Sequence, residues 1–84
     1  VNINYLELKG NNITDISSLK NCINMQALYL DFNPIEDISI IVNMKNLERL
    51  SLSNTKISDI SLLTEYDKLK YLNVNNTLLS ENSI

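Results

Sequence analysis

The stretch at residues 28–38 reads Leu-Tyr-Leu-Asp-Phe-Asn-Pro-Ile-Glu-Asp-Ile, and its pattern recurs along the whole chain of 84 residues. Residues 6–16 read Leu-Glu-Leu-Lys-Gly-Asn-Asn-Ile-Thr-Asp-Ile, and residues 50–60 read Leu-Ser-Leu-Ser-Asn-Thr-Lys-Ile-Ser-Asp-Ile. A fourth copy begins at Leu72, and neighbouring copies are 22 residues apart. A fixed period of this length indicates a repeat architecture, so the copies are expected to share one local structure.

Each copy contains two apolar patterns that predict different elements. The opening Leu-x-Leu alternation favours a short strand with one buried face. The later Ile-x-Asp-Ile-x-x-Leu places apolar residues three apart, which suits a 3₁₀ or short helical turn. A single copy cannot bury these residues, so copies must stack with their strands parallel, and about three copies are needed for stability. The sequence predicts an α/β solenoid, with short parallel strands on its concave face and short helical turns on its convex face.

The repeat boundaries follow from the period. Residues 1–84 are expected to form one array, with repeats at about 3–24, 25–46 and 47–68 and a partial repeat at 69–84. We expect this segment to be a fragment of a longer array.

The shared positions resemble the leucine-rich repeat family, whose pattern is Leu-x-x-Leu-x-Leu-x-x-Asn-x-Leu. The 22-residue length with Ile-x-Asp-Ile is similar to a subclass found in internalin-type bacterial surface proteins and in an intracellular phosphatase regulator. The resemblance implies a right-handed superhelix and a role in protein recognition. The sequence departs from the pattern at Thr55 and Thr77, which stand at the Asn position, and at Asn82, where an Ile is expected.

One polar column contains Asn11, Asn33, Thr55 and Thr77. We expect these side chains to form an internal ladder that bonds the backbone of the turn after each strand, because buried turn backbone needs partners. Threonine has no amide with which to donate twice. A looser turn is therefore predicted in the third and fourth copies.

A second column is acidic and contains Asp15, Asp37, Asp59 and Glu81. Such carboxylates could bind a hard cation such as calcium. The alternative is capping of a helix start, with each Asp accepting from backbone N–H groups near Ser17, Ser39 or Ser61. Capping explains why Asp comes directly before Ile-Ser in three copies, so the sequence predicts capping and no metal site.

The composition excludes several functional classes. The chain has no histidine, which excludes Ser-His-Asp and Cys-His catalysis. The single Cys22 cannot form an intramolecular disulfide and is expected to be a small buried hydrophobe. The single Gly10 excludes a glycine-rich phosphate loop. We therefore predict no enzyme activity and no cofactor.

The charge and hydropathy patterns bear on partners in the same way. A net charge of −3 without a basic block argues against nucleic acid. No apolar run is long enough for membrane insertion.

The outward-pointing strand residues remain as the candidate site. The predicted protein-binding residues are Tyr5, Glu7, Lys9, Tyr29, Asp31, Phe32, Arg49, Ser51, Tyr71 and Asn73. An exposed Phe32 near Tyr29 and Arg49 is the kind of cluster that carries binding energy. The alternative is that these are ordinary solvated strand residues and that Phe32 packs against a neighbouring loop.

Two functions follow from these observations. The first is a non-catalytic module that binds another protein on its concave strand face. The alternative is a structural segment that associates end to end, because neither end of the chain carries a recognisable cap. The resemblance of the Ile-x-Asp-Ile phrase to internalin-type proteins implies a bacterial cell-surface or secreted protein, with the cytoplasm or nucleus as the alternative.

Overall fold

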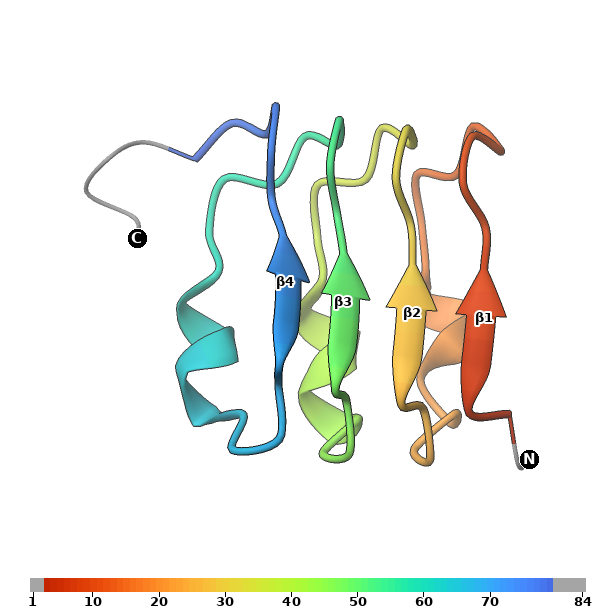
Figure 1. The fold of residues 1–84 in the computed structure, drawn as a ribbon. Helices are drawn as coiled ribbons and strands as arrows, with labels where there is room; N and C mark the ends of the chain where they lie inside the picture. Colours follow the sequence, from red (N-terminus) through yellow and green to blue (C-terminus); the bar gives the residue numbers. More distant parts are fainter. Residues whose placement is uncertain (1–2, 80–84) are drawn as a thin grey trace.

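The computed structural model describes residues 3–79, and its strands form one parallel sheet in the order β1-β2-β3-β4 (Figure 1). The strands are β1 (Tyr5–Glu7), β2 (Ala27–Tyr29), β3 (Arg49–Ser51) and β4 (Tyr71–Asn73). The 3₁₀ helices between them are η1 (Ser17–Leu19), η2 (Ser39–Asn43) and η3 (Ser61–Glu65). The predicted order of a short strand followed by a short helical turn is therefore confirmed.

The strands pair without any offset between copies. Leu6 lies opposite Leu28, Leu28 opposite Leu50, and Leu50 opposite Leu72. The backbone hydrogen bonds continue beyond the strand ends, as in the 2.9 Å bond from the Leu8 N–H to the Tyr29 carbonyl oxygen. This register brings corresponding residues of successive copies side by side across the sheet.

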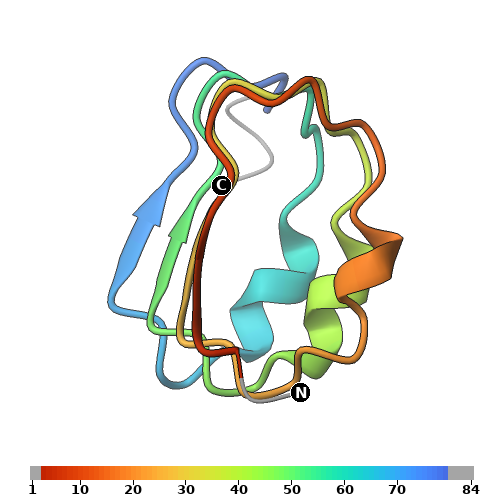
Figure 2. The same cartoon turned by 90° about the vertical axis from the view of Figure 1, so that its right-hand side faces the viewer.

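The core lies between the sheet and the 3₁₀ helices, which form the two sides of the molecule (Figure 2). Side chains that repeat every 22 residues fill it because stacking makes them continuous. Its fully buried aliphatic side chains are Met25, Leu28, Leu30, Ile35, Ile41, Met44, Leu47, Leu50, Leu52 and Ile57. Leu72 is the inward residue of β4 but is 38% exposed, because no further strand of the described residues packs on β4.

Cys22 is a free, buried thiol in this core, as predicted. Met44 stands one repeat further on and is also buried. In the next copy the Tyr66 hydroxyl donates to the Ile41 carbonyl oxygen, and burial raises the pKa of this phenol. The position held by Cys22, Met44 and Tyr66 in successive copies can therefore hold an aromatic residue, because the hydroxyl of that residue has a hydrogen-bond partner.

The turn after each strand contains a residue with a left-handed backbone. Gly10, Phe32, Asn54 and Asn76 occupy the same place in successive copies, with φ between 56° and 68°. Glycine and asparagine adopt this conformation readily, whereas a bulky side chain does so rarely. This explains how a chain with one glycine builds four similar turns, and it makes Phe32 the exception among them.

Within residues 3–79, no helix is long and apolar enough to cross a membrane.

Candidate protein-binding surface

The outward side chains of the four strands form a surface that we call the strand face, made of residues 5, 7, 27, 29, 49, 51, 71 and 73. Tyr5 and Tyr29 are in contact on it, with ring centroids 5.6 Å apart and planes tilted by 55°. Tyr5 is 60% exposed and Tyr71 is 44% exposed, while Arg49 is exposed between Ala27 and Tyr71 in the register. Two tyrosines from adjacent copies thus give an amphipathic contact area of the kind used in protein recognition.

Phe32 lies beyond the end of β2 rather than on it, and its side chain is 54% exposed. The Lys9 Nζ atom lies 5.5 Å from the centroid of the Phe32 ring. The structure therefore places Phe32 with a cation from the first copy, at the edge of the strand face, and its side chain remains largely in solvent.

The middle of the strand face is tied together by polar contacts. Asp31 Oδ1 accepts from the Ser51 hydroxyl at 2.5 Å and from the Ser53 backbone N–H at 3.0 Å. Ser51 is only 2% exposed, so it supports the surface rather than presenting a free hydroxyl. Glu7 accepts from the Lys9 backbone N–H at 2.6 Å, and the Asn73 side chain accepts from the Asn75 backbone N–H at 3.0 Å. These carbonyl and carboxylate oxygens hold the strand ends in place.

Asn33 connects the first and second copies from the inside. Its Oδ1 accepts from the backbone N–H groups of Asn11 and Ile13 at 2.8 and 2.9 Å. Its Nδ2 donates to the carbonyl oxygens of Leu8, Leu30 and Asp31 at 3.0 to 3.1 Å. This is the internal ladder that the sequence predicted, and it fixes the turn that carries Phe32.

The threonines make fewer contacts than Asn33. Among the described residues, the Thr55 hydroxyl bonds only the Leu52 carbonyl oxygen, at 2.7 Å. The Thr77 hydroxyl donates to the Val74 carbonyl oxygen at 2.9 Å and accepts from the Leu79 N–H at 3.4 Å. Neither hydroxyl connects one copy to the copy before it, so the looser turns of the third and fourth copies stay a prediction for hydrogen exchange.

The acidic column lies on the opposite side of the molecule, where its carboxylates precede the 3₁₀ helices. Oδ1 of Asp15, Asp37 and Asp59 accepts at 2.8 Å from the backbone N–H group two residues later, at Ser17, Ser39 and Ser61. The predicted contacts from the Asp side chains to the serine N–H groups at the helix starts are thus confirmed in these three copies, with each Asp directly before the N-cap residue Ile16, Ile38 or Ile60. Glu81 lies outside the described residues.

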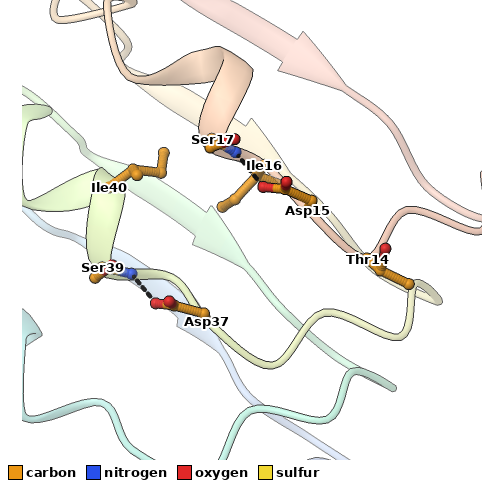
Figure 3. A pocket seen from close by; sticks show the side chains of 7 residues that line it. All are labelled: Thr14, Asp15, Ile16, Ser17, Asp37, Ser39 and Ile40. Carbon is orange, nitrogen blue, oxygen red and sulfur yellow. Dashed lines mark hydrogen bonds between the residues drawn. The ribbon is translucent and has the colours of Figure 1, made fainter.

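The space between two of these caps is a pocket of about 300 Å³ (Figure 3). Asp15 and Asp37 line it, and each carboxylate is directed to its own serine N–H. Within the described residues, no three His, Cys, Asp or Glu side chains come together in a way that could hold a metal ion. The column acts as a series of caps.

These caps give the unfolding transition a dependence on pH. The serine backbone N–H, and secondly the serine side chain, stabilise each carboxylate and lower the pKa values of Asp15, Asp37 and Asp59. A pKa that is lower in the folded chain stabilises the fold above the unfolded-state pKa of about 4. This stabilisation is lost as the pH falls through the folded-state pKa.

We expect the melting temperature to fall below about pH 4, and to fall less steeply in a chain with Asp→Asn substitutions at all three caps. An Asn oxygen can still accept the serine N–H, so the cap persists without a titrating group. Circular dichroism melts between acid and neutral pH measure both slopes. Identical slopes would mean that these caps do not contribute to acid unfolding.

The comparisons with known proteins identify the repeat. A model described as leucine-rich repeats in two copies matches residues 1–43 and 45–83. A search of curated proteins found no match. An internalin (InlF) of Listeria monocytogenes superposes with a TM-score of 0.92 at 33% identity, covering 96% of this chain and 24% of that chain. Internalin C2 of the same organism gives 0.90 at 35% identity, over 94% of this chain and 35% of that chain.

A leucine-rich repeat protein of Leptospira interrogans also matches, with a TM-score of 0.78 at 25% identity over 94% of this chain and 27% of that chain. This chain thus spans about a quarter to a third of the length of these structures. The solenoid expected from the sequence is confirmed by these neighbours together with the parallel sheet and the 3₁₀ turns. From the match of the repeat model over nearly the whole sequence, the chain belongs to the leucine-rich repeat family.

Proposed function

We propose that the chain is a non-catalytic protein-binding module whose strand face holds a partner protein. Leucine-rich repeat domains generally serve protein interaction, and solenoids present extended surfaces for this purpose. The observation that carries the proposal is the contact between Tyr5 and Tyr29, two aromatic rings from adjacent copies on the outward side of the sheet. Neither ring belongs to the hydrophobic core, so the packing of the core does not explain why tyrosines stand at these two positions.

The surrounding residues support an interface of mixed chemistry. Tyr71 adds a further exposed aromatic side chain on β4, and Arg49 lies next to it in the register, between Ala27 and Tyr71. Tyrosine and arginine are, with tryptophan, the side chains enriched among the residues that contribute most to binding energy at interfaces. Glu7, Asp31 and Asn73 hold backbone N–H groups, which keeps the surface rigid before the partner arrives.

The test is a chain carrying Tyr29→Ala together with Arg49→Ala. We expect the fold to remain intact and the affinity for a partner to fall about tenfold or more, because the aromatic pair and the cation are lost together. A partner captured by the native chain and identified by mass spectrometry would be titrated against both proteins by calorimetry. Circular dichroism would confirm that the variant is folded.

The matched control is Val42→Ala with Lys45→Ala, on or next to η2 on the opposite side of the molecule. Both side chains are exposed, so their truncation should leave affinity unchanged. If the control weakened binding and the strand-face variant did not, the partner would dock on the helical side and the proposal would fail.

A further inference from the structure

A hollow of about 480 Å³ lies at the edge of the molecule where the strands end. We call it the turn-edge hollow. Residues of all four copies contribute to it, among them Asn12, Phe32, Pro34, Asn54, Lys56 and Asn76. It is separate from the strand face, because its walls are the turns that follow the strands.

Phe32 is the least expected side chain in this hollow. Its backbone has a φ of 58°, where Cβ comes too close to the following carbonyl oxygen. Glycine has no Cβ and adopts this conformation readily, asparagine adopts it occasionally, and bulky side chains rarely do. The corresponding residues in the other copies are Gly10, Asn54 and Asn76, which fit the turn. The ring is more than half exposed, so burial in the core does not offset the strain. Strain kept for an exposed aromatic ring indicates that the ring serves something outside the fold.

One lysine lies in the wall of the hollow and another lies beside it. The Lys9 ammonium lies against the Phe32 ring, and Lys56 belongs to the wall. Among the described residues of the wall none is acidic, although the whole chain carries a net charge of −3. In the part of the chain that the structure describes, neither lysine forms an ion pair with a carboxylate of the chain itself. Both ammonium groups are therefore available to carboxylates from elsewhere.

We propose that the turn-edge hollow docks an acidic peptide segment of a partner, in which an aromatic or aliphatic side chain lies next to carboxylates. The apolar side chain would pack on Phe32 and Pro34, which together form the apolar part of the wall. The carboxylates would pair with Lys9 and Lys56. The side-chain amides of Asn54 and Asn76 would bond the peptide backbone, since each carries both a donor and an acceptor.

The experiment is a selection from a displayed library of random peptides on the immobilised chain. The proposal expects enriched sequences with Asp or Glu next to an aromatic or aliphatic residue. An enriched peptide is then synthesised, and its affinity is measured by fluorescence anisotropy. Phe32→Asn and Lys56→Glu should each weaken its binding about tenfold or more. Basic or uncharged enriched sequences, the absence of enrichment, or equal binding by these variants would overturn the proposal.

Two further variants separate this surface from the strand face. The pair Tyr29→Ala with Arg49→Ala should leave the affinity for the acidic peptide within about twofold, because neither residue lines the hollow. A large loss in this pair would place the peptide on the strand face and overturn the turn-edge assignment. The strand-face proposal can fail independently, since it is tested with a whole partner protein.

The stability of Phe32→Asn tests the argument from strain. Asparagine occupies the same turn at positions 54 and 76, so the variant should melt at the same or a higher temperature than the native chain. A variant that binds less and melts no lower shows that Phe32 is kept for binding. A clearly lower melting temperature would show that Phe32 is kept for stability and would overturn its role in docking.

Discussion

Leu30→Ala is expected to lower the free energy of unfolding by about 2–5 kcal/mol. Leu30 is fully buried and belongs to the second copy, which has a neighbour on each side. The truncation removes apolar contacts and leaves a cavity that neighbouring copies cannot easily fill, because their own side chains are fixed by the register. Such a loss is a large share of the stability of so small a unit, which is in the range of about 5–15 kcal/mol at best. Urea unfolding followed by circular dichroism gives the value.

The matched comparison is Val74→Ala, at the same position two copies later. Val74 is half-buried, since no further strand of the described residues packs on β4. Its truncation should therefore cost clearly less than that of Leu30, beyond the difference expected from the smaller side chain. Equal losses would mean that an additional element covers the last strand.

Asn33→Ala is expected to have an effect of similar size, about 3–5 kcal/mol, although it removes no apolar surface. The side chain is 1% exposed and makes two accepted and three donated hydrogen bonds to backbone groups. Alanine would remove the partner of the Asn11 and Ile13 N–H groups and of the Leu30 carbonyl oxygen, and each buried group left unpaired costs about 1–3 kcal/mol. The carbonyl oxygens of Leu8 and Asp31 keep hydrogen bonds from the Asn11 side chain and the Gly10 N–H. Denaturant unfolding measures the total loss.

The matched control for Asn33 is Thr55→Ala, at the corresponding position in the next copy. Thr55 donates one hydrogen bond, so its loss should cost about 1 kcal/mol. Hydrogen exchange adds a local measurement, because the amides of Asn11 and Ile13 should lose protection in Asn33→Ala and keep it in Thr55→Ala. Similar effects of the two variants would show that the ladder does not hold the turns.

The sequence predicted the scaffold well because the scaffold residues recur every 22 residues. The inward leucines, the Asp-Ile-Ser caps and the Asn33 contacts follow from residue type and phase, which are visible in the printed sequence. The burial of Ser51 could not be predicted in this way. Its phase points outward, yet it is buried, and its hydroxyl donates a hydrogen bond to Asp31 of the preceding copy.

The surroundings of Phe32 show where a sequence argument ends. Alignment with Gly10, Asn54 and Asn76 contains the signal for a left-handed turn, because those are the residues that tolerate it. The approach of Lys9 depends on side-chain rotamers in a different copy, and the hollow with Lys56 depends on how the turns stack. Neither property repeats with the period, so the sequence pattern contains no information about it.

The pairing of strands without offset has a consequence for how binding specificity can change. Because Ala27, Arg49 and Tyr71 are aligned across the sheet, the outer surface works as a grid, with one row per copy and one column per strand position. A substitution at one outward position changes the chemistry there, while the neighbouring outward side chains and the backbone stay where they are. Under the proposed binding on the strand face, single substitutions would therefore change the contacted surface one position at a time, while the register of the other copies stays the same.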